Sequence, residues 1–97
     1  MEETLERLRK LQSMCIRLRE DKLIEASKFF IEFRKFVSLL PQAYKFKGYS
    51  DTTSKELTVD ALTSVWKYHN GIYAGSFEEC KAEISKILVK LYKDLTS

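Results

Sequence analysis

Apolar residues recur along most of this chain at steps of three and four, the spacing that places side chains on one face of an α-helix. Between these positions, the first segment carries mainly arginine, lysine and glutamate. Its apolar positions are Leu5, Leu8, Leu11, Cys15 and Leu18. They predict an amphipathic helix over about residues 3–20. Asp21 follows where the pattern breaks and can cap a second helix by accepting hydrogen bonds from its first free amides.

The second periodic segment is the most apolar part of the chain and predicts a helix over about residues 22–40. The repeating positions are Leu23, Ala26, Phe30, Phe33, Val37 and Leu40, widened by Ile24, Phe29, Phe36 and Leu39. Each phenylalanine can bury about 150–250 Å², so we expect this helix to be the centre of the core. It also has more apolar positions than one face of a bundle can cover, which favours homo-oligomerisation through the surplus.

Pro41 marks the end of the second helix, because proline cannot continue the backbone hydrogen bonds and disfavours a helical residue before it. Alternatively, Pro41 opens a short helical turn over residues 41–47, closed by Gly48. Residues 48–56 are polar and lack periodic apolar positions. We expect them to form the one substantial surface loop of the protein.

The third predicted helix spans residues 58–70 and carries Leu62, Val65 and Trp66. Two caps can open it: Thr53 with Glu56 at capping-box spacing, or Thr58 with Asp60 in the first turn. The pair Asn70–Gly71 is suited to a left-handed helix end, which places the end of the helix there.

The fourth helix has the clearest start, since Ser76 and Glu79 stand at capping-box spacing. It is predicted over residues 77–95. Its apolar positions are Phe77, Cys80, Ile84, Ile87, Leu88, Leu91 and Leu95. No alternating strand pattern longer than a few residues occurs along the chain. The fold class expected is therefore all-α, a compact bundle of four main helices in a single domain over residues 1–97.

Composition agrees with a small helical protein. Of 97 residues, 44% are hydrophobic and 32% charged, with 3 glycines and 1 proline, which is too few breakers for a loop-rich fold. Seventeen basic and fourteen acidic residues give a net charge of +3, too small and too mixed to favour a nucleic-acid site. No apolar run is long enough to cross a membrane. The acidic start, Met1–Thr4, is unlike a secretion signal, so we expect an intracellular protein, cytoplasmic or nuclear.

The chemistry needed for catalysis is missing from the sequence pattern. One histidine and two cysteines offer no Ser-His-Asp or Cys-His arrangement and too few ligands for a zinc site. His69 is expected to interact with the end of its helix. Cys15 and Cys80 fall on apolar stripes, where reduced cysteine acts as a small hydrophobic residue, although a disulfide between them stays an alternative. We expect no catalytic residue, no metal and no cofactor.

Aromatic residues outside the stripes are the best candidates for a binding site, because tyrosine and tryptophan combine a large apolar body with a polar tip. One group follows the second helix and the other lies at the end of the third. The candidate partner-binding residues are Tyr44, Tyr49, Leu62, Trp66, Tyr68, Ile72 and Tyr73. For Trp66, a place in the core is an equal alternative. Lysines nearby favour an acidic, hydrophobic segment of a disordered partner protein.

The second half of the chain also has a pattern known from one family. Residues 56–63 (ELTVDALT), residues 65–69 (VWKYH) and residues 89–95 (VKLYKDL) resemble the N-terminal helical domain of transcription elongation factor S-II, of which the LEDGF-type integrase-binding domain is a relative. The similarity covers roughly residues 55–95. Tyr92 stands where the family usually has tryptophan, a "T-x-I-G" step after Leu62 is absent, and the stretch between Phe36 and Leu57 is unusually long.

This resemblance implies a non-catalytic bundle that docks short disordered motifs of transcription or chromatin proteins. The positions that carry over from the family are Leu62, Trp66, Tyr68 and Ile72. Two other hypotheses remain beside a motif-docking module. One is a small bacterial or phage inhibitor or immunity protein that sequesters a folded target through its charged faces, as a complete short gene product from Met1 to Ser97 would permit. The other is homo-oligomeric assembly.

Overall fold

The computed structural model describes residues 1–69 and 75–97, except for the side chains of Ser64, Tyr68 and His69. Within these ranges the chain forms helices and no strand. The helices are α1 (Glu2–Ile16), α2 (Leu23–Val37), α3 (Leu40–Phe46), α4 (Asp51–His69) and α5 (Phe77–Thr96). The predicted all-α bundle of four main helices, with a short additional one, is therefore confirmed.

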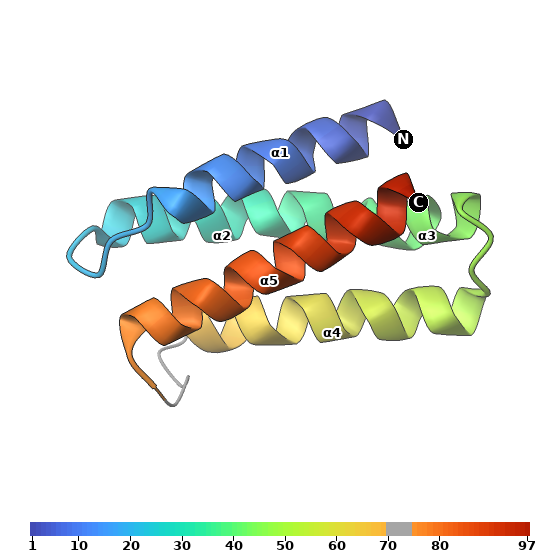
Figure 1. Cartoon of the computed structure of the whole chain (residues 1–97). Coiled ribbons are helices and arrows are strands. Elements are labelled where there is room, and N and C mark those ends of the chain that lie inside the picture. Colours follow the sequence, from blue (N-terminus) through green and yellow to red (C-terminus); the bar gives the residue numbers. More distant parts are fainter. Residues whose placement is uncertain (70–74) are drawn as a thin grey trace.

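The four long helices run antiparallel to their neighbours, and the short α3 extends the bundle beyond the end of α2 (Figure 1). Helix α1 packs between α2 and α5, and α4 packs against the same two helices from the opposite side. Helix α3 packs mainly on α4. Both chain ends lie at the α3 end of the bundle (Figure 1).

Phenylalanines of α2 occupy the centre of the core, as predicted. Phe29, Phe33 and Phe36 are fully buried. The ring centroids of Phe29 and Phe33 lie 6.1 Å apart, and so do those of Phe33 and Phe36. These separations are typical of favourable aromatic pairs. Helix α2 packs against α1, α3 and α4, so its aromatic stripe joins the layers of the bundle.

Both cysteines lie in the core as free thiols. Cys15 is 2% exposed and Cys80 3% exposed, on α1 and α5 respectively. Burial raises the pKa of the Cys15 thiol, against a smaller opposing effect of Lys81. Burial also raises the pKa of the Cys80 thiol, and the carboxylate of Glu83 acts in the same direction. A thiol with a raised pKa is a poor nucleophile at neutral pH, so these residues contribute packing rather than reactivity.

The two cysteines mark the place where α1 meets α5. Cys15 Sγ lies 3.9 Å from the carbonyl oxygen of Lys81, which places the C-terminal part of α1 beside the first turns of α5. Small side chains at this position let the two helices approach closely.

Helix α1 is shorter than predicted. It ends at Ile16 rather than near residue 20, although Leu18 is still only 2% exposed. Leu18 reaches the core from the connecting segment, and Lys81 Nζ donates hydrogen bonds to the carbonyl oxygens of Ile16 (2.9 Å) and Leu18 (3.0 Å). A lysine from a distant helix therefore satisfies carbonyls that another helical turn would have used. The predicted cap by Asp21 is also wrong: Lys22 is the N-cap of α2 and makes no side-chain cap bond.

The second helix also ends earlier than predicted, at Val37 instead of near residues 39–40. The alternative in which Pro41 opens a short helical turn is confirmed, because Pro41 lies in the first turn of α3. There its missing N–H leaves no hydrogen bond unmade. Gly48 closes this turn with φ +97°, and its N–H donates to the carbonyl oxygen of Lys45 at 2.9 Å.

The predicted loop over residues 48–56 is wrong for most of its length, since α4 begins at Asp51. The hydroxyl of Ser50 accepts a hydrogen bond from the backbone N–H of Thr53 at 3.1 Å, in place of the caps expected at Thr53 or Thr58. Ser54 and Thr58 are buried, and each hydroxyl donates to the carbonyl oxygen four residues earlier at 2.7 Å. These internal bonds let polar residues form a buried helix face.

Helix α5 matches its prediction to within one residue. The Ser76 hydroxyl accepts a hydrogen bond from the backbone N–H of Glu79 at 3.1 Å, as the capping-box spacing predicts. The helix end predicted at Asn70–Gly71 lies outside the described residues.

Candidate docking surface

Tyr44 is the clearest correction among the candidate partner-binding residues. Its side chain is fully buried in the core, so it is not available for the surface contact expected of it. Tyr49 is half-buried and packs edge-on against Tyr44, with 5.2 Å between the ring centroids. The lysines around this pair predict an exposed aromatic end, but the rings instead fill space at the α3 end of the bundle.

The second group of candidates lies on α4 and the segment after it. Leu62 is half-buried, and Trp66, one helical turn later, is 47% exposed. The side chain of Tyr68, and Ile72 and Tyr73 entirely, lie outside the described part of the chain. The structure therefore brings Leu62 and Trp66 together on one side of α4.

Several large apolar side chains that were not selected as candidates from the sequence are exposed on α2 and α4. On α2 these are Leu23 (76% exposed), Ile24 (69%) and Ile31 (54%), and on α4 there is Val59 (59%). For the three residues of α2, the surplus of apolar positions in that helix is the feature of the sequence that indicates exposure. Ile24 and Ile31 are seven residues apart, so they share a face, and that face points away from the buried phenylalanines.

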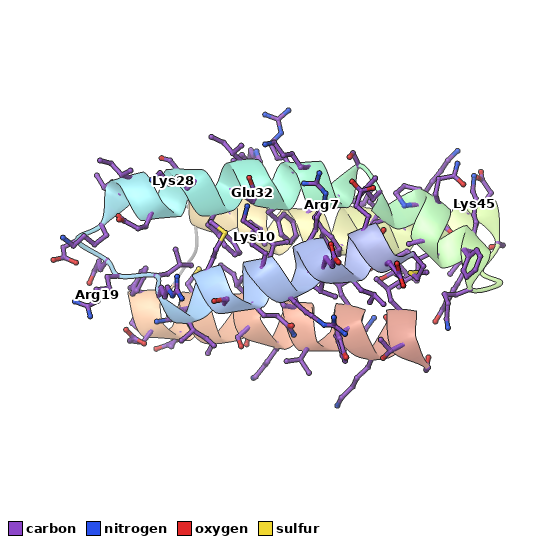
Figure 2. All side chains as sticks on the ribbon, turned by 90° about the horizontal axis from the view of Figure 1, so that it is seen from above. Arg7, Lys10, Arg19, Lys28, Glu32 and Lys45 are labelled. Carbon is purple, nitrogen blue, oxygen red and sulfur yellow. The ribbon has the colours of Figure 1, made fainter. Side chains whose placement is uncertain are left out.

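Ion pairs show which side of α2 faces α1. Glu32 Oε2 lies 3.4 Å from Lys10 Nζ and 4.0 Å from Arg7 Nη1, both on α1, and Figure 2 shows these side chains directed toward one another. Helical geometry places Leu23 and Arg34 on the side of α2 opposite to Glu32. They lie on the side where α4 packs.

A small cavity of about 130 Å³ between α4 and α5 shows which side of α4 faces α5. Leu57, Asp60 and Ala61 of α4 line this cavity together with Ile87 and Leu91 of α5. The side of α4 away from α5 carries Val59, Leu62 and Trp66, and it faces α2. Leu23 therefore lies on the side of α2 that faces Val59, Leu62 and Trp66 of α4, and Ile24 and Ile31 lie on the adjoining outer side of α2. We call this group of residues the α2–α4 face, consisting of Leu23, Ile24, Ile31, Val59, Leu62 and Trp66.

Four basic residues border the α2–α4 face, together with the exposed Glu56, which lies three residues before Val59 on α4. Lys28 and Arg34 of α2 are exposed and have no ion pair among the described residues. Lys35 pairs with Glu32 at 3.5 Å. Lys55 at the start of α4 pairs with Asp51 at 3.1 Å. The apolar residues are therefore bordered by cations that the rest of the protein neutralises only in part.

Outside this face, the residues that the structure describes do not gather into a metal site. No group of three or more histidine, cysteine, aspartate or glutamate side chains among them could hold a metal ion. An open cavity of about 670 Å³ lies between the end of α1 and the start of α5. Lys81 borders this cavity, but its ammonium group is already bonded to the carbonyl oxygens of Ile16 and Leu18.

Comparisons with protein-family models, curated proteins and solved structures find no match to this chain. Among the described helices, none has the length and apolar character needed to cross a lipid bilayer. The role of the α2–α4 face is therefore inferred from its own geometry and chemistry.

The cation cluster around Glu32 predicts a pH dependence of stability. Burial opposes ionisation of Glu32, but Lys10 and Lys35 outweigh it and hold the pKa of this carboxyl below its usual value. Such a group stabilises the fold above its unfolded-state pKa of about 4.3, and this contribution is lost as pH falls through the lower folded-state value. We expect Glu32→Gln to show a smaller loss of stability between about pH 6 and pH 3 than the wild type in urea unfolding.

Glu83→Gln is the matched control, because Glu83 is exposed and pairs with Lys86 at 3.6 Å on its own helix. It should keep the acid sensitivity of the wild type. An identical acid sensitivity in Glu32→Gln and the wild type would contradict the assigned role of the cluster.

Proposed function

We propose that this protein is a non-enzymatic docking module that binds a short segment of a partner protein on the α2–α4 face. The observation that carries the proposal is the group of exposed apolar side chains contributed by two neighbouring helices. Exposing such residues together is unfavourable in water, and a contiguous apolar patch with a polar rim is typical of a protein-binding site. Trp66 adds an aromatic side chain of the kind that dominates binding energy at many interfaces.

The family resemblance in the second half of the chain is consistent with this proposal. Two of the positions that it implies for partner binding, Leu62 and Trp66, lie on the α2–α4 face. Docking a disordered motif of a transcription or chromatin protein is the specific form of the proposal that this resemblance suggests. The partner would cover the apolar residues and become ordered along the helix surface on binding.

The first experiment is a selection of displayed peptides against the whole chain, followed by titration of each hit with Trp66 fluorescence as the signal. Trp66 is the only tryptophan and lies within the proposed face, so its emission reports on occupancy. We expect the hits to compete for one site. The double variant Leu23→Ala/Ile31→Ala should weaken their binding at least tenfold, which corresponds to about 1.4 kcal/mol.

The same double variant should leave thermal stability nearly unchanged, because both side chains are largely exposed. Val89→Ala is the control, since Val89 is also an exposed apolar residue (44%) but lies on α5. It should bind the peptides like the wild type. Equal affinity of the wild type and the double variant would place the binding site elsewhere and refute the proposal.

A further inference from the structure

The exposed surface of α2 alternates apolar and cationic side chains. Ile24, Lys28, Ile31 and Lys35 follow one another at steps of four, three and four, which places them in one row along the helix. Arg34 borders Ile31 on the other side of this row, three residues away. All five side chains are exposed.

The two acidic residues of α2 lie at the edge of this row that is nearer to α1. Glu25 and Glu32 are seven residues apart and therefore share the side of the helix that faces α1. Glu32 is already surrounded by Arg7, Lys10 and Lys35. Lys28 forms no ion pair with either glutamate among the described residues, and no acidic residue of α2 lies three or four positions from Arg34, so both cations stay available to carboxylates of a partner.

This charge pattern decides between two occupants of the face. If a second copy packed its own α2 antiparallel on this row with the two-fold axis beside Ile31, Lys28 of one copy would lie beside Lys35 of the other. Like charges at such positions are unfavourable. A partner with carboxylates at the edges of its apolar surface would instead meet Lys28, Arg34 and Lys35 with opposite charge.

We propose that the segment docked on the α2–α4 face is an acidic amphipathic helix of a partner protein, lying along the outer surface of α2. This inference rests on the proposed function and specifies its ligand. Ile24 and Ile31 are two helical turns apart, about 10.5 Å along the axis, so a partner helix can match them with apolar residues at positions i, i+3 or i+4, and i+7. Its glutamates or aspartates flank these positions and pair with the lysines and Arg34.

The test uses two synthetic helical peptides with the same apolar row of leucines. One carries glutamate at the flanking positions and the other glutamine. We expect the glutamate peptide to bind the full chain at least tenfold more tightly at about 50 mM salt, and the difference to shrink to less than threefold at about 500 mM salt because screening weakens the charge contacts. Binding is followed by Trp66 fluorescence and checked by calorimetry.

The charge-reversal variant Lys28→Glu/Arg34→Glu should lower the affinity for the glutamate peptide at least tenfold and change the affinity for the glutamine peptide less than twofold. The control Arg9→Glu/Lys93→Glu makes the same change in net charge at exposed residues of α1 and α5 that have no ion pair among the described residues. It should leave the preference for the glutamate peptide intact.

Other outcomes overturn the inference in distinguishable ways. In one such outcome, both peptides bind with equal affinity, and Leu23→Ala/Ile31→Ala weakens the binding of each. That result would support docking on the α2–α4 face but refute the inference that the ligand is acidic. A dimer in light scattering that Ile31→Asp dissociates would identify a second copy as the occupant. No binding of either peptide, together with no effect of the apolar variants on display-selected ligands, would refute the proposed function itself.

Discussion

Replacing Phe33 with alanine is expected to lower the free energy of unfolding by about 3–5 kcal/mol, the usual cost of removing a buried phenylalanine. Phe33 is fully buried and lies between Phe29 and Phe36, so its loss leaves a cavity that the surrounding helices cannot easily fill. Chemical denaturation followed by circular dichroism measures this change directly.

Phe46→Ala is the matched control, because Phe46 is 76% exposed at the end of α3. It should change stability by no more than about 0.5 kcal/mol. A similar loss in both variants would contradict the view that the aromatic stripe of α2 forms the centre of the core.

Replacing Tyr44 with phenylalanine is expected to raise the free energy of unfolding by about 1–3 kcal/mol, the cost of a buried polar group without a partner. The Tyr44 hydroxyl is buried and makes no hydrogen bond within the described part of the protein. Burial raises the pKa of this hydroxyl, and Asp94 and Tyr49 act in the same direction, so it is neutral at pH 7. The substitution removes only the unpaired oxygen and keeps the ring. Urea unfolding of the two proteins measures the difference.

Tyr49→Phe serves as the comparison, since Tyr49 is only half-buried beside the same ring. It should have little effect on stability. If Tyr44→Phe instead destabilises the protein, the hydroxyl must have a hydrogen-bond partner such as a bound water, and the assignment of an unpaired group would be wrong.

The start of α4 shows where sequence reasoning failed and why. Serine and threonine favour caps and turns in isolation, so the polar residues after Gly48 indicate a loop. In the folded protein Ser54 and Thr58 bond to carbonyl groups of their own helix and face the core. Whether such residues stay in a loop or join a helix depends on a packing surface from distant parts of the chain.

The candidate site could be predicted only in part, for a related reason. The structure leaves Leu62 and Trp66 on the outer side of α4 but buries Tyr44, because the burial of Tyr44 depends on how α3 packs on α4. The exposed Ile24 and Ile31 could not be separated from the core by periodicity, since apolar residues occur on both sides of α2. The neighbouring helices decide which side is covered.

The sequence by itself determined the helical class, the aromatic centre in α2 and the capped start of α5, because local spacing and capping chemistry act within a few residues. It offered the turn at Pro41 only as one of two alternatives, and the structure decided between them. Tertiary structure decided the end of α1, where Lys81 reaches across from α5. It also decided the burial of Tyr44 and the exposure of the α2–α4 face. These features depend on contacts between residues far apart in the chain, which a local pattern does not encode.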